Sequence, residues 1–477
     1  YELAYIPSSL QIDEAALAYN AFNIANYGVD RYTNLYPIYF LNFYSGQSPM
    51  YPYLAAILVK IFGYSLFVVR IPAVFFGLLT LVFGFLIGKE LKGNGFGVLL
   101  AFIITICPVF IMTSRWALDC YLMLGLFTVS IYVLLRAIRS GKIGLFVLSG
   151  VMFGLTLYTY ALSYLTIPIV LLGILIYLIY LKKVTFKQFM AVAFPLLIIA
   201  LPLILNVLVQ CGIVGEFQTR FFTIKRMERD GVGEISLSNV WTNLTNIGNY
   251  FINDPINNTR NIYGTLYMFS IPLVILGFVL FAYNTFKGIK ERIFSTEAYL
   301  FVIFICYFVS LLFVLYSTTI LWRSNAIFLC YAIFLAYGLY FVGSHLKGAL
   351  KIMLLVYLIS FNSFMYYYFN IFNSKENPSK EVNYVRALAD ADKKEKEIYS
   401  INLDVLQWTN VWAGLGLKTK PWFYKEYAEC FDKICFFVPN ENYEDKIYIV
   451  LEKRATRLLD DGFTCKKYGT IYECYKE

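Results

Sequence analysis

The sequence has little of what most soluble enzymes use for charge and metal chemistry. Only 15% of its 477 residues are charged, and His345 is its one histidine. None of its nine cysteines has the Cys-x-x-Cys spacing, so an ordinary zinc site is not expected. Apolar residues take the place of charge: 59% of the chain is hydrophobic, against about 45–50% in soluble domains. The composition predicts a protein that crosses a membrane several times.

Ten apolar runs of spanning length follow one another along the chain. We place them near 66–88, 96–113, 117–138, 143–161, 163–181, 188–209, 265–286, 298–317, 323–343 and 351–371. A shorter apolar stretch that ends at Phe62 is better suited to lie along the membrane surface. The runs predict an all-α transmembrane domain over residues 1–373, with an eleventh span ahead of Tyr1 if the N-terminus is cytoplasmic.

Every second connection between these runs is basic. The lysines and arginines gather at residues 89–92, 136–142, 182–187, 287–292 and 347–351. By the positive-inside rule these connections face the cytoplasm, which places a first loop at 1–62, a long loop at 210–264 and the tail at 374–477 on the outer side. The net charge of +9 then reflects membrane orientation, so no nucleic acid partner is expected.

The polar tail, residues 374–477, predicts a separate extracytoplasmic α/β domain. A helix at 379–391 is followed by short alternating segments typical of strands. The tail has no glycine-rich phosphate loop and no nucleophile motif. Its four cysteines permit two disulfides outside the cytoplasm, in pairings that the sequence leaves open: Cys430, Cys435, Cys465 and Cys474.

Charged residues from distant parts of the sequence share the outer side in this topology. Asp13 and Glu14 open a helical run, where two carboxylates beside apolar sequence suit an active site. An acidic residue at a helix start also caps free backbone N–H groups, so a purely structural role stays open. Arg115 and Asp119, four residues apart, fit either the same site or an ion pair along one helix.

Further cations belong to the same side. Arg323 opens a predicted span, where it suits either a site or an interfacial arginine that extends toward water. The long loop adds Arg220 and Lys225, as part of a lid over a lipid or of a solvated interfacial helix. A carboxylate can accept the proton of an attacking hydroxyl, and arginine can hold a departing phosphate. These groups therefore suit the transfer of a sugar from a lipid phosphate to an alcohol.

Four segments carry a resemblance to a known family. They are Asp13-Glu14-Ala15, Gly46-Gln47-Ser48-Pro49-Met50-Tyr51-Pro52-Tyr53, Val69-Arg70-Ile71-Pro72 and Ser114-Arg115-Trp116-Ala117-Leu118-Asp119. In this order they are similar to the first outer loop and the following spans of GT-C glycosyltransferases. Among these, the sequence most resembles the protein O-mannosyltransferases and the lipid A aminoarabinose transferase.

The resemblance implies roles for individual residues. Asp13 is the expected catalytic base or acceptor-orienting carboxylate. At Gln47 and Tyr160 the aminoarabinose transferase has charged residues instead, so lipid A is not expected as the acceptor. The expected substrate contacts are Glu14, Asp119, Arg115, Gln47 and Tyr160, and the expected contacts to the donor phosphate are Arg323, Arg220 and Lys225.

These expectations describe an inverting transferase in a plasma membrane, with its active site on the outer face. Its donor is a polyprenyl-phosphate sugar, and its acceptor is a hydroxyl of a cell-surface polymer, a glycolipid or a protein. No cofactor is expected to be required, because the leaving group is already a lipid phosphate, and nothing indicates a divalent metal. The alternative is a transporter or flippase of lipid-linked saccharides, which the nearly charge-free middle of the spans disfavours.

Overall fold

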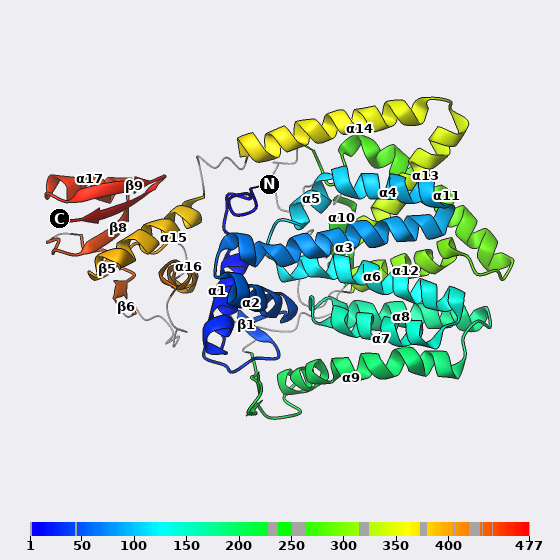
Figure 1. Cartoon of the computed structure of the whole chain (residues 1–477), viewed down its shortest axis with the longest axis horizontal. Helices are drawn as coiled ribbons and strands as arrows, with labels where there is room; N and C mark the ends of the chain where they lie inside the picture. The colour runs from blue at the N-terminus through cyan, green and yellow to red at the C-terminus, as the bar shows by residue number, and fades with distance from the viewer. Residues whose placement is uncertain are drawn as a thin grey trace.

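The computed structural model places most of the chain in helices, with a small sheet near the C-terminus (Figure 1). The residues that it describes are 2–42, 45–227, 237–249, 263–313, 324–372, 379–403, 406–418, 430–431, 433–440 and 442–476.

Among the described residues, seven helices are long and apolar enough to cross a membrane. They are α3 (Leu66–Lys92), α6 (Asp119–Ser140), α8 (Ser163–Tyr180), α9 (Phe186–Gln210), α11 (Ile271–Lys290) with the 3-10 turn Met268–Ser270, α13 (Ile327–His345), and α14 (Ala349–Tyr366) with the π-helical Tyr367–Phe372. Shorter helices complete the bundle: α4 (Asn94–Ile106), α5 (Pro108–Thr113), α7 (Ile143–Leu157) and α12 (Thr296–Leu312). Each predicted run falls on one or two of these helices, which confirms an all-α membrane domain.

The predicted run at 96–113 is divided between two helices. α4 ends before Cys107, whose backbone is extended with φ −77° and ψ 136°, and Pro108 then opens α5. The residue before a proline avoids helical dihedrals because the proline ring clashes with its backbone. The break brings the end of α5 into the turn at residues 114–118 that precedes α6.

α2 (Met50–Phe62) is the helix predicted to lie along the membrane surface. Its Tyr51 and Ala55 are fully buried, whereas Ile57 and Ile61 are 57% and 66% exposed. It packs against α1 (Ile12–Tyr27) on its buried side. An apolar exposed face on a helix of this length suits the membrane interface.

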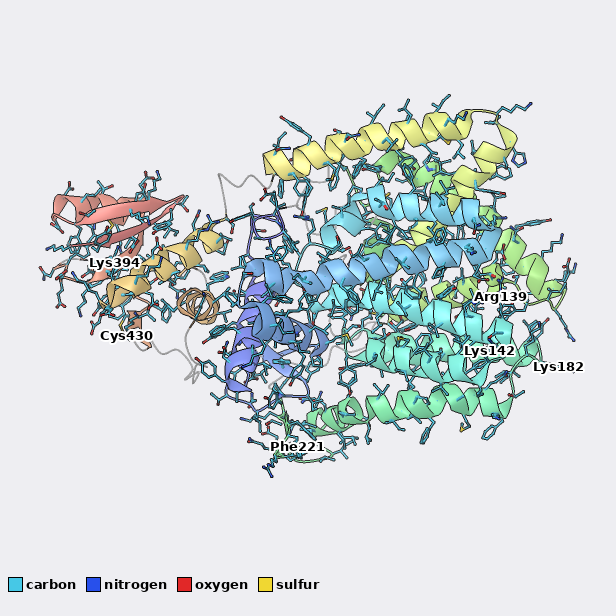
Figure 2. The ribbon with its side chains drawn as sticks, in the orientation of Figure 1. Arg139, Lys142, Lys182, Phe221, Lys394 and Cys430 are labelled. Carbon is cyan, nitrogen blue, oxygen red and sulfur yellow. A yellow bond between two sulfur atoms is a disulfide. The ribbon has the colours of Figure 1, made fainter. Side chains whose placement is uncertain are left out.

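The bundle has two chemically different ends. Arg139 and Lys182, on predicted cytoplasmic connections, lie at one end, which we call the basic end (Figure 2). Phe221 and Cys430 lie at or beyond the opposite end, where α1 also lies; we call it the α1 end (Figures 1 and 2). The acidic helix and the basic connections are therefore at opposite ends, as the alternation of charge predicts.

The tail contains a six-stranded sheet in the order β6-β7-β5-β8-β10-β9, with β5 parallel to its two neighbours and the other pairs antiparallel. Side chains alternate along β8, so Ile447 packs with helix α15 on one face and Tyr448 packs with α17 on the other. This confirms a small α/β domain. Its elements are α15 (Lys380–Ala391), β5 (Ile398–Ser400), α16 (Leu406–Leu417), β6 (Cys430–Phe431), β7 (Ile434–Cys435), β8 (Ile447–Leu451), α17 (Glu452–Asp460), β9 (Thr464–Tyr468) and β10 (Ile471–Tyr475).

Two disulfides join neighbouring strands of this sheet. Cys430 is bonded to Cys435 across β6 and β7, and Cys465 is bonded to Cys474 across β9 and β10. In both cases the two residues are directly opposite each other in the antiparallel register. Opposite residues bring their Cβ atoms within bonding reach. Strand register thus decides the pairing that the sequence left open.

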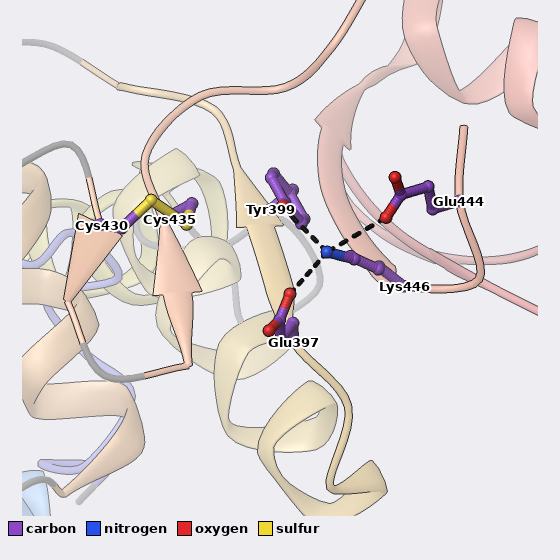
Figure 3. The surroundings of a disulfide bond; sticks show 6 residues. All are labelled: Glu397, Tyr399, Cys430, Cys435, Glu444 and Lys446. Carbon is purple, nitrogen blue, oxygen red and sulfur yellow. Dashed lines mark hydrogen bonds and ion pairs between the residues drawn. A yellow bond between two sulfur atoms is a disulfide. The ribbon is translucent and has the colours of Figure 1, made fainter. Parts of the chain in front are cut away.

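A lysine ties together the starts of β5 and β8 near the first disulfide (Figure 3). The Lys446 ammonium donates to the Glu397 carboxylate at 2.6 Å and to the Tyr399 hydroxyl at 3.1 Å, and it lies 3.2 Å from the Glu444 carboxylate. Hydrogen bonding to Glu397 foremost favours the charged ammonium and raises the pKa of Lys446. These contacts hold the parallel pair of strands in register.

The tail packs directly against α1. Helix α16 lies beside α1, and one hydrophobic core contains Ala15 and Tyr19 of α1 together with Trp412 of α16 (Figure 1). Gly414 lies at a close approach, because a Cβ there would be 2.7 Å from ring atoms of Tyr19. A larger residue would have to displace that buried ring. The predicted separate domain therefore shares a core with the helix at the start of the chain.

Candidate active site

Helix α1 carries Asp13, the predicted catalytic base. Four of its alanines are fully buried, which lets neighbouring helices approach it closely. The helix ends where Gly28 adopts a left-handed φ of 71° and donates its N–H to the Ile24 carbonyl. Asp13 and Glu14 lie in the first turn, where the positive end of the helix dipole favours carboxylates.

Asp13 is partly buried against a short β-hairpin formed by β1 (Phe40–Asn42) and β2 (Ser45–Gln47). The Asn42 side-chain amide donates to Asp13 Oδ1 at 3.0 Å, and the Gln47 amide donates to the backbone carbonyl of Asp13 at 3.3 Å. Within the described residues, no group donates to Asp13 Oδ2. The described part of the protein thus binds one of the two carboxylate oxygens of Asp13.

Asp119 reaches the same segment from the start of α6. Its Oδ2 accepts from the backbone N–H of Ser48 at 3.0 Å, and its Oδ1 accepts from the N–H of Cys120 at 2.8 Å. Ser48 directly follows Gln47, so Asp13 and Asp119 bind adjacent residues. The structure thereby brings together Asp13, Gln47 and Asp119, three of the predicted site residues, from separate parts of the sequence.

Two buried polar atoms in this segment have no hydrogen-bond partner in the described part of the chain. They are Gln47 Oε1 and Ser48 Oγ. Gln47 is 3% exposed and Ser48 is fully buried. Buried polar groups nearly always have a partner, so these two atoms are exceptions, and a small partner such as water would satisfy them.

Glu14, in contrast, is bound by other parts of the protein. It is fully buried, and Arg70 donates to its two oxygens at 2.7 and 3.0 Å. The backbone N–H of Ala117 donates to the same carboxylate at 3.1 Å. Arg70 also donates to the carbonyls of Leu3 and Pro7 at 3.0 and 3.2 Å. The pair therefore joins the N-terminal segment, α1, α3 and the turn before α6.

Arg115 is not on the same helix as Asp119, so the alternative of an ion pair along one helix is wrong. It lies in the turn ahead of α6 and donates to the Ile6 carbonyl at 3.0 Å. Its guanidinium carbon is 4.8 Å from the ring centroid of Phe369, in the π-helical segment that follows α14. Burial lowers the pKa of Arg115, although the nearby Tyr368 opposes this shift. Arg115 thus links the N-terminal segment to the last turns of α14.

Tyr160 lies beside the start of α6. It is partly buried and packs on a cluster that includes Trp116, Leu118 and Tyr121. Tyr160 therefore packs on residues that flank Asp119 in the sequence.

Arg220 and Lys225 lie on a different element. Residues Phe217–Gln218 and Thr223–Ile224 pair as strands β3 and β4, so this part of the long loop is a hairpin rather than the predicted interfacial helix. The hairpin docks where the Ile38 N–H donates to the Thr223 carbonyl at 3.2 Å. Both cations are exposed there, and the described contacts do not bring them to Asp13.

Arg323 lies outside the described residues. Asn325, two positions later, is fully buried, and its amide donates to the Cys120 carbonyl at 2.8 Å. Asn325 therefore contacts the residue that directly follows Asp119.

Arg31 is a residue of this region to which the sequence assigned no role. It is 4% exposed, and its Nη2 donates to Asn42 Oδ1 at 2.9 Å. The only signal in the sequence is a charged residue within a polar, aromatic loop, which is equally typical of a solvated turn. The bond to Asn42 appears only once β1 folds back beside the loop.

Few of these residues suit a metal. Within the described part of the chain, no three His, Cys, Asp or Glu side chains gather in a way that could hold an ion. The expectation that no cofactor is required stays a prediction.

Comparisons with known proteins give two kinds of match. Residues 46–209 match the family model of dolichyl-phosphate-mannose-protein mannosyltransferase, a range that includes Gln47, Asp119 and Tyr160. Among solved structures, ArnT from Cupriavidus metallidurans bound to undecaprenyl phosphate matches with a TM-score of 0.58 at 12% identity, covering 99% of this chain and 95% of ArnT. This chain has a GT-C membrane fold.

The GT-C fold extends over nearly the whole chain. ArnT from the same organism in the apo state matches with a TM-score of 0.55 at 12% identity, covering 97% of this chain and 93% of that one. An oligosaccharyltransferase from Archaeoglobus fulgidus in complex with zinc and sulfate matches with a TM-score of 0.50 at 15% identity. The match covers 85% of this chain and 57% of the oligosaccharyltransferase. No curated protein matches the sequence significantly. The resemblance to GT-C glycosyltransferases is therefore confirmed at the level of the fold.

Proposed function

We propose that the protein is an inverting glycosyltransferase that moves a sugar from a polyprenyl-phosphate donor to a hydroxyl of a saccharide, a glycolipid or a protein. The observation that carries the proposal is the meeting of Asp13, Gln47 and Asp119 at the α1 end of a GT-C fold. The donor class follows from the relatives. The matching family is that of dolichyl-phosphate-mannose-protein mannosyltransferases, and the matching ArnT structure is bound to undecaprenyl phosphate.

Asp13 is the proposed base. The acceptor oxygen forms a bond to the anomeric carbon on the face opposite the lipid phosphate, while the bond from that carbon to the phosphate oxygen breaks. The proton of the acceptor hydroxyl passes to Asp13. The Asn42 amide donates to this carboxylate, and Asp13 lies in the first turn of α1.

Gln47 and Ser48 are the proposed contacts to sugar hydroxyls. Their buried Oε1 and Oγ atoms lack partners in the described part of the chain, and they belong to the segment that joins Asp13 to Asp119. An amide oxygen accepts and a hydroxyl both donates and accepts, which matches the groups on a sugar ring. Tyr160 is a further proposed substrate contact, because it packs beside the start of α6.

The donor phosphate requires a cation, and Arg323 is the proposed one. The contact of Asn325 with the Cys120 carbonyl supports this choice, since Asn325 is two positions from Arg323 in the sequence and Cys120 follows Asp119. Arginine can bind a phosphate through paired hydrogen bonds and so stabilise the lipid phosphate as it leaves. Arg220 and Lys225 are second choices, because their hairpin is exposed and docks at Ile38.

The outer face of the membrane is the proposed location of the site. Two disulfides in the tail suit an oxidising compartment, and the tail packs against α1. The basic connections, which favour the cytoplasm, lie at the other end of the bundle (Figure 2). Both observations support an outward-facing Asp13.

Asp13→Asn tests the proposal. The probes are undecaprenyl phosphates linked to radiolabelled mannose, glucose or galactose, given to the protein in nanodiscs with a cell-envelope extract as acceptor. We expect the wild type to transfer at least one sugar, and Asp13→Asn to lower kcat about 10²–10⁴-fold, as for loss of a general base. Binding of undecaprenyl phosphate should be unchanged. The control is Asp460→Asn, an exposed change in α17.

Wild-type turnover by Asp13→Asn would overturn the role of Asp13. A wild-type protein that neither binds undecaprenyl phosphate nor consumes any of the three donors would overturn the proposed function. Movement of intact donor across a vesicle membrane, without cleavage, would point to transport instead.

A further inference from the structure

A buried arginine lies two hydrogen bonds behind Asp13. Arg31 Nη2 donates to Asn42 Oδ1 at 2.9 Å, and Asn42 Nδ2 donates to Asp13 Oδ1 at 3.0 Å. Arg31 and Asn42 are 4% and 6% exposed, so water has little access to either bond. The three residues form one continuous chain of hydrogen bonds from a guanidinium to the proposed base.

The guanidinium decides which way the Asn42 amide points. Arginine has donors only, so the Asn42 oxygen must face Arg31, and the NH₂ group must then face Asp13. The reverse orientation would set donor against donor on one side and acceptor against acceptor on the other. Arg31 thus fixes Asn42 as a donor to the carboxylate.

Arg31 is itself held in place relative to α1. Its backbone N–H donates to Asn20 Oδ1 at 3.1 Å, and Asn20 is on the same helix as Asp13, about two turns further on. Its Nη2 also lies 3.2 Å from the Tyr32 hydroxyl, to which it donates. The Asp30 carboxylate accepts from the Tyr32 N–H at 2.9 Å and so stabilises the turn. Arg31, the residue of the hydrogen-bond chain that is furthest from Asp13, is therefore held in place by the folded loop.

We infer that Arg31 and Asn42 are positioning residues for the proposed reaction. They hold Asp13 Oδ1 and leave Oδ2 directed to the acceptor hydroxyl, and both act through Asp13 rather than on the substrate. A charged donor polarises the Asn42 amide and strengthens its bond to the ionised carboxylate. The inference rests on the proposed function, because it takes Asp13 as the base.

Three variants test the chain of hydrogen bonds from Arg31 to Asp13. Asn42→Leu removes both bonds at similar size, Arg31→Met removes the charge at similar length, and Arg31→Lys keeps a donor-only cation. With the donor that the wild type consumes, we expect Asn42→Leu and Arg31→Met to lower kcat about 10- to 100-fold, as a misplaced catalytic group does. KM for the donor and the affinity for undecaprenyl phosphate should stay at the wild-type values. Arg31→Lys should recover most of the lost kcat.

Asn23→Leu is the matched control. Asn23 is a fully buried asparagine of α1 that takes no part in the hydrogen bonds from Arg31 to Asp13. The same chemical change there should leave kcat unaltered. Thermal unfolding of all variants separates loss of positioning from loss of fold.

The outcomes distinguish this inference from the proposed function. If Asp13→Asn abolishes transfer while Asn42→Leu and Arg31→Met keep the wild-type kcat, the proposed function stands and the inference is overturned. A loss of kcat that follows thermal stability across the variants, without rescue by Arg31→Lys, also overturns it. If Asp13→Asn itself keeps full turnover, the proposed function fails first.

Discussion

The two ends of the helix bundle carry charge in opposite ways. At the α1 end, Glu14, Arg31 and Arg70 are almost completely buried and bonded to particular partners. At the basic end, Arg136 and Arg139 are 47% and 37% exposed and share the Glu90 carboxylate. A buried charge is costly unless it is paired and hydrogen-bonded, whereas an exposed charge is solvated by water. At the basic end a single charge can therefore be removed at little cost in stability. At the α1 end the removal of one partner leaves a buried charge unpaired.

The largest expected effect follows from breaking the buried pair. Arg70→Ala leaves the Glu14 carboxylate buried without its cation, which costs about 3–5 kcal/mol in comparable pairs. We expect a large drop in the unfolding temperature and in the yield of purified protein. Arg70→Lys should lie in between, because an ammonium cannot reproduce the fork of a guanidinium. Arg136→Ala at the basic end is the control, and an Arg70→Ala protein as stable as the wild type would contradict the comparison.

A smaller effect is expected where the tail meets α1. Gly414→Val places side-chain atoms against the buried Tyr19 ring, and overpacking of this kind costs about 1–3 kcal/mol. We expect a lower unfolding temperature and a lower kcat, because the displaced helix carries Asp13. Gly144→Ala is the matched control, since a Cβ at that position in α7 meets no atom within 4 Å. Equal behaviour of the two variants would mean that the tail does not support α1.

Asp390 separates burial from location, because it is a partly exposed charge in the tail, beyond the α1 end. Hydrogen bonds from Lys393 and Lys466 lower the pKa of Asp390 below its ordinary value of 3.8. A lowered pKa in the folded state stabilises the fold above the ordinary value and is lost as the carboxylate is protonated in acid. Asp390→Asn should thus be less stable than the wild type at pH 7, by about 1 kcal/mol or less, and the difference should narrow progressively as the pH falls below 3.8. A gap that widens in acid would have the wrong sign.

The smallest effect is expected at the basic end. Glu90→Gln removes the carboxylate that Arg136 and Arg139 share, but both arginines stay in contact with water. We expect a change of about 0–1 kcal/mol in the free energy of unfolding, and less at high salt. Thermal unfolding at two salt concentrations measures it. A loss as large as that of Arg70→Ala would remove the distinction between the ends.

The neighbours Asp13 and Glu14 show where prediction from sequence stops. Adjacent residues of a helix point about 100° apart, so one can face a ligand while the next faces the core. The sequence assigned both to the substrate, and the structure pairs Glu14 with Arg70. The sequence predicted no role for Arg31 and Asn42 for a related reason. Single polar residues in a loop have no periodic pattern, and their value lies in a partner that folding brings to them.

By itself, the sequence determined the apolar helices, the segregation of basic connections to one end and the GT-C resemblance of the first outer loop. Each depends on local composition or on short motifs, because hydrocarbon demands a certain length of apolar chain and water attracts the charges between. Only the tertiary structure decided which carboxylate is buried with arginine, how four cysteines pair and where the tail docks. These depend on contacts between residues far apart in the chain, and no local pattern records a contact that exists only after the chain has folded.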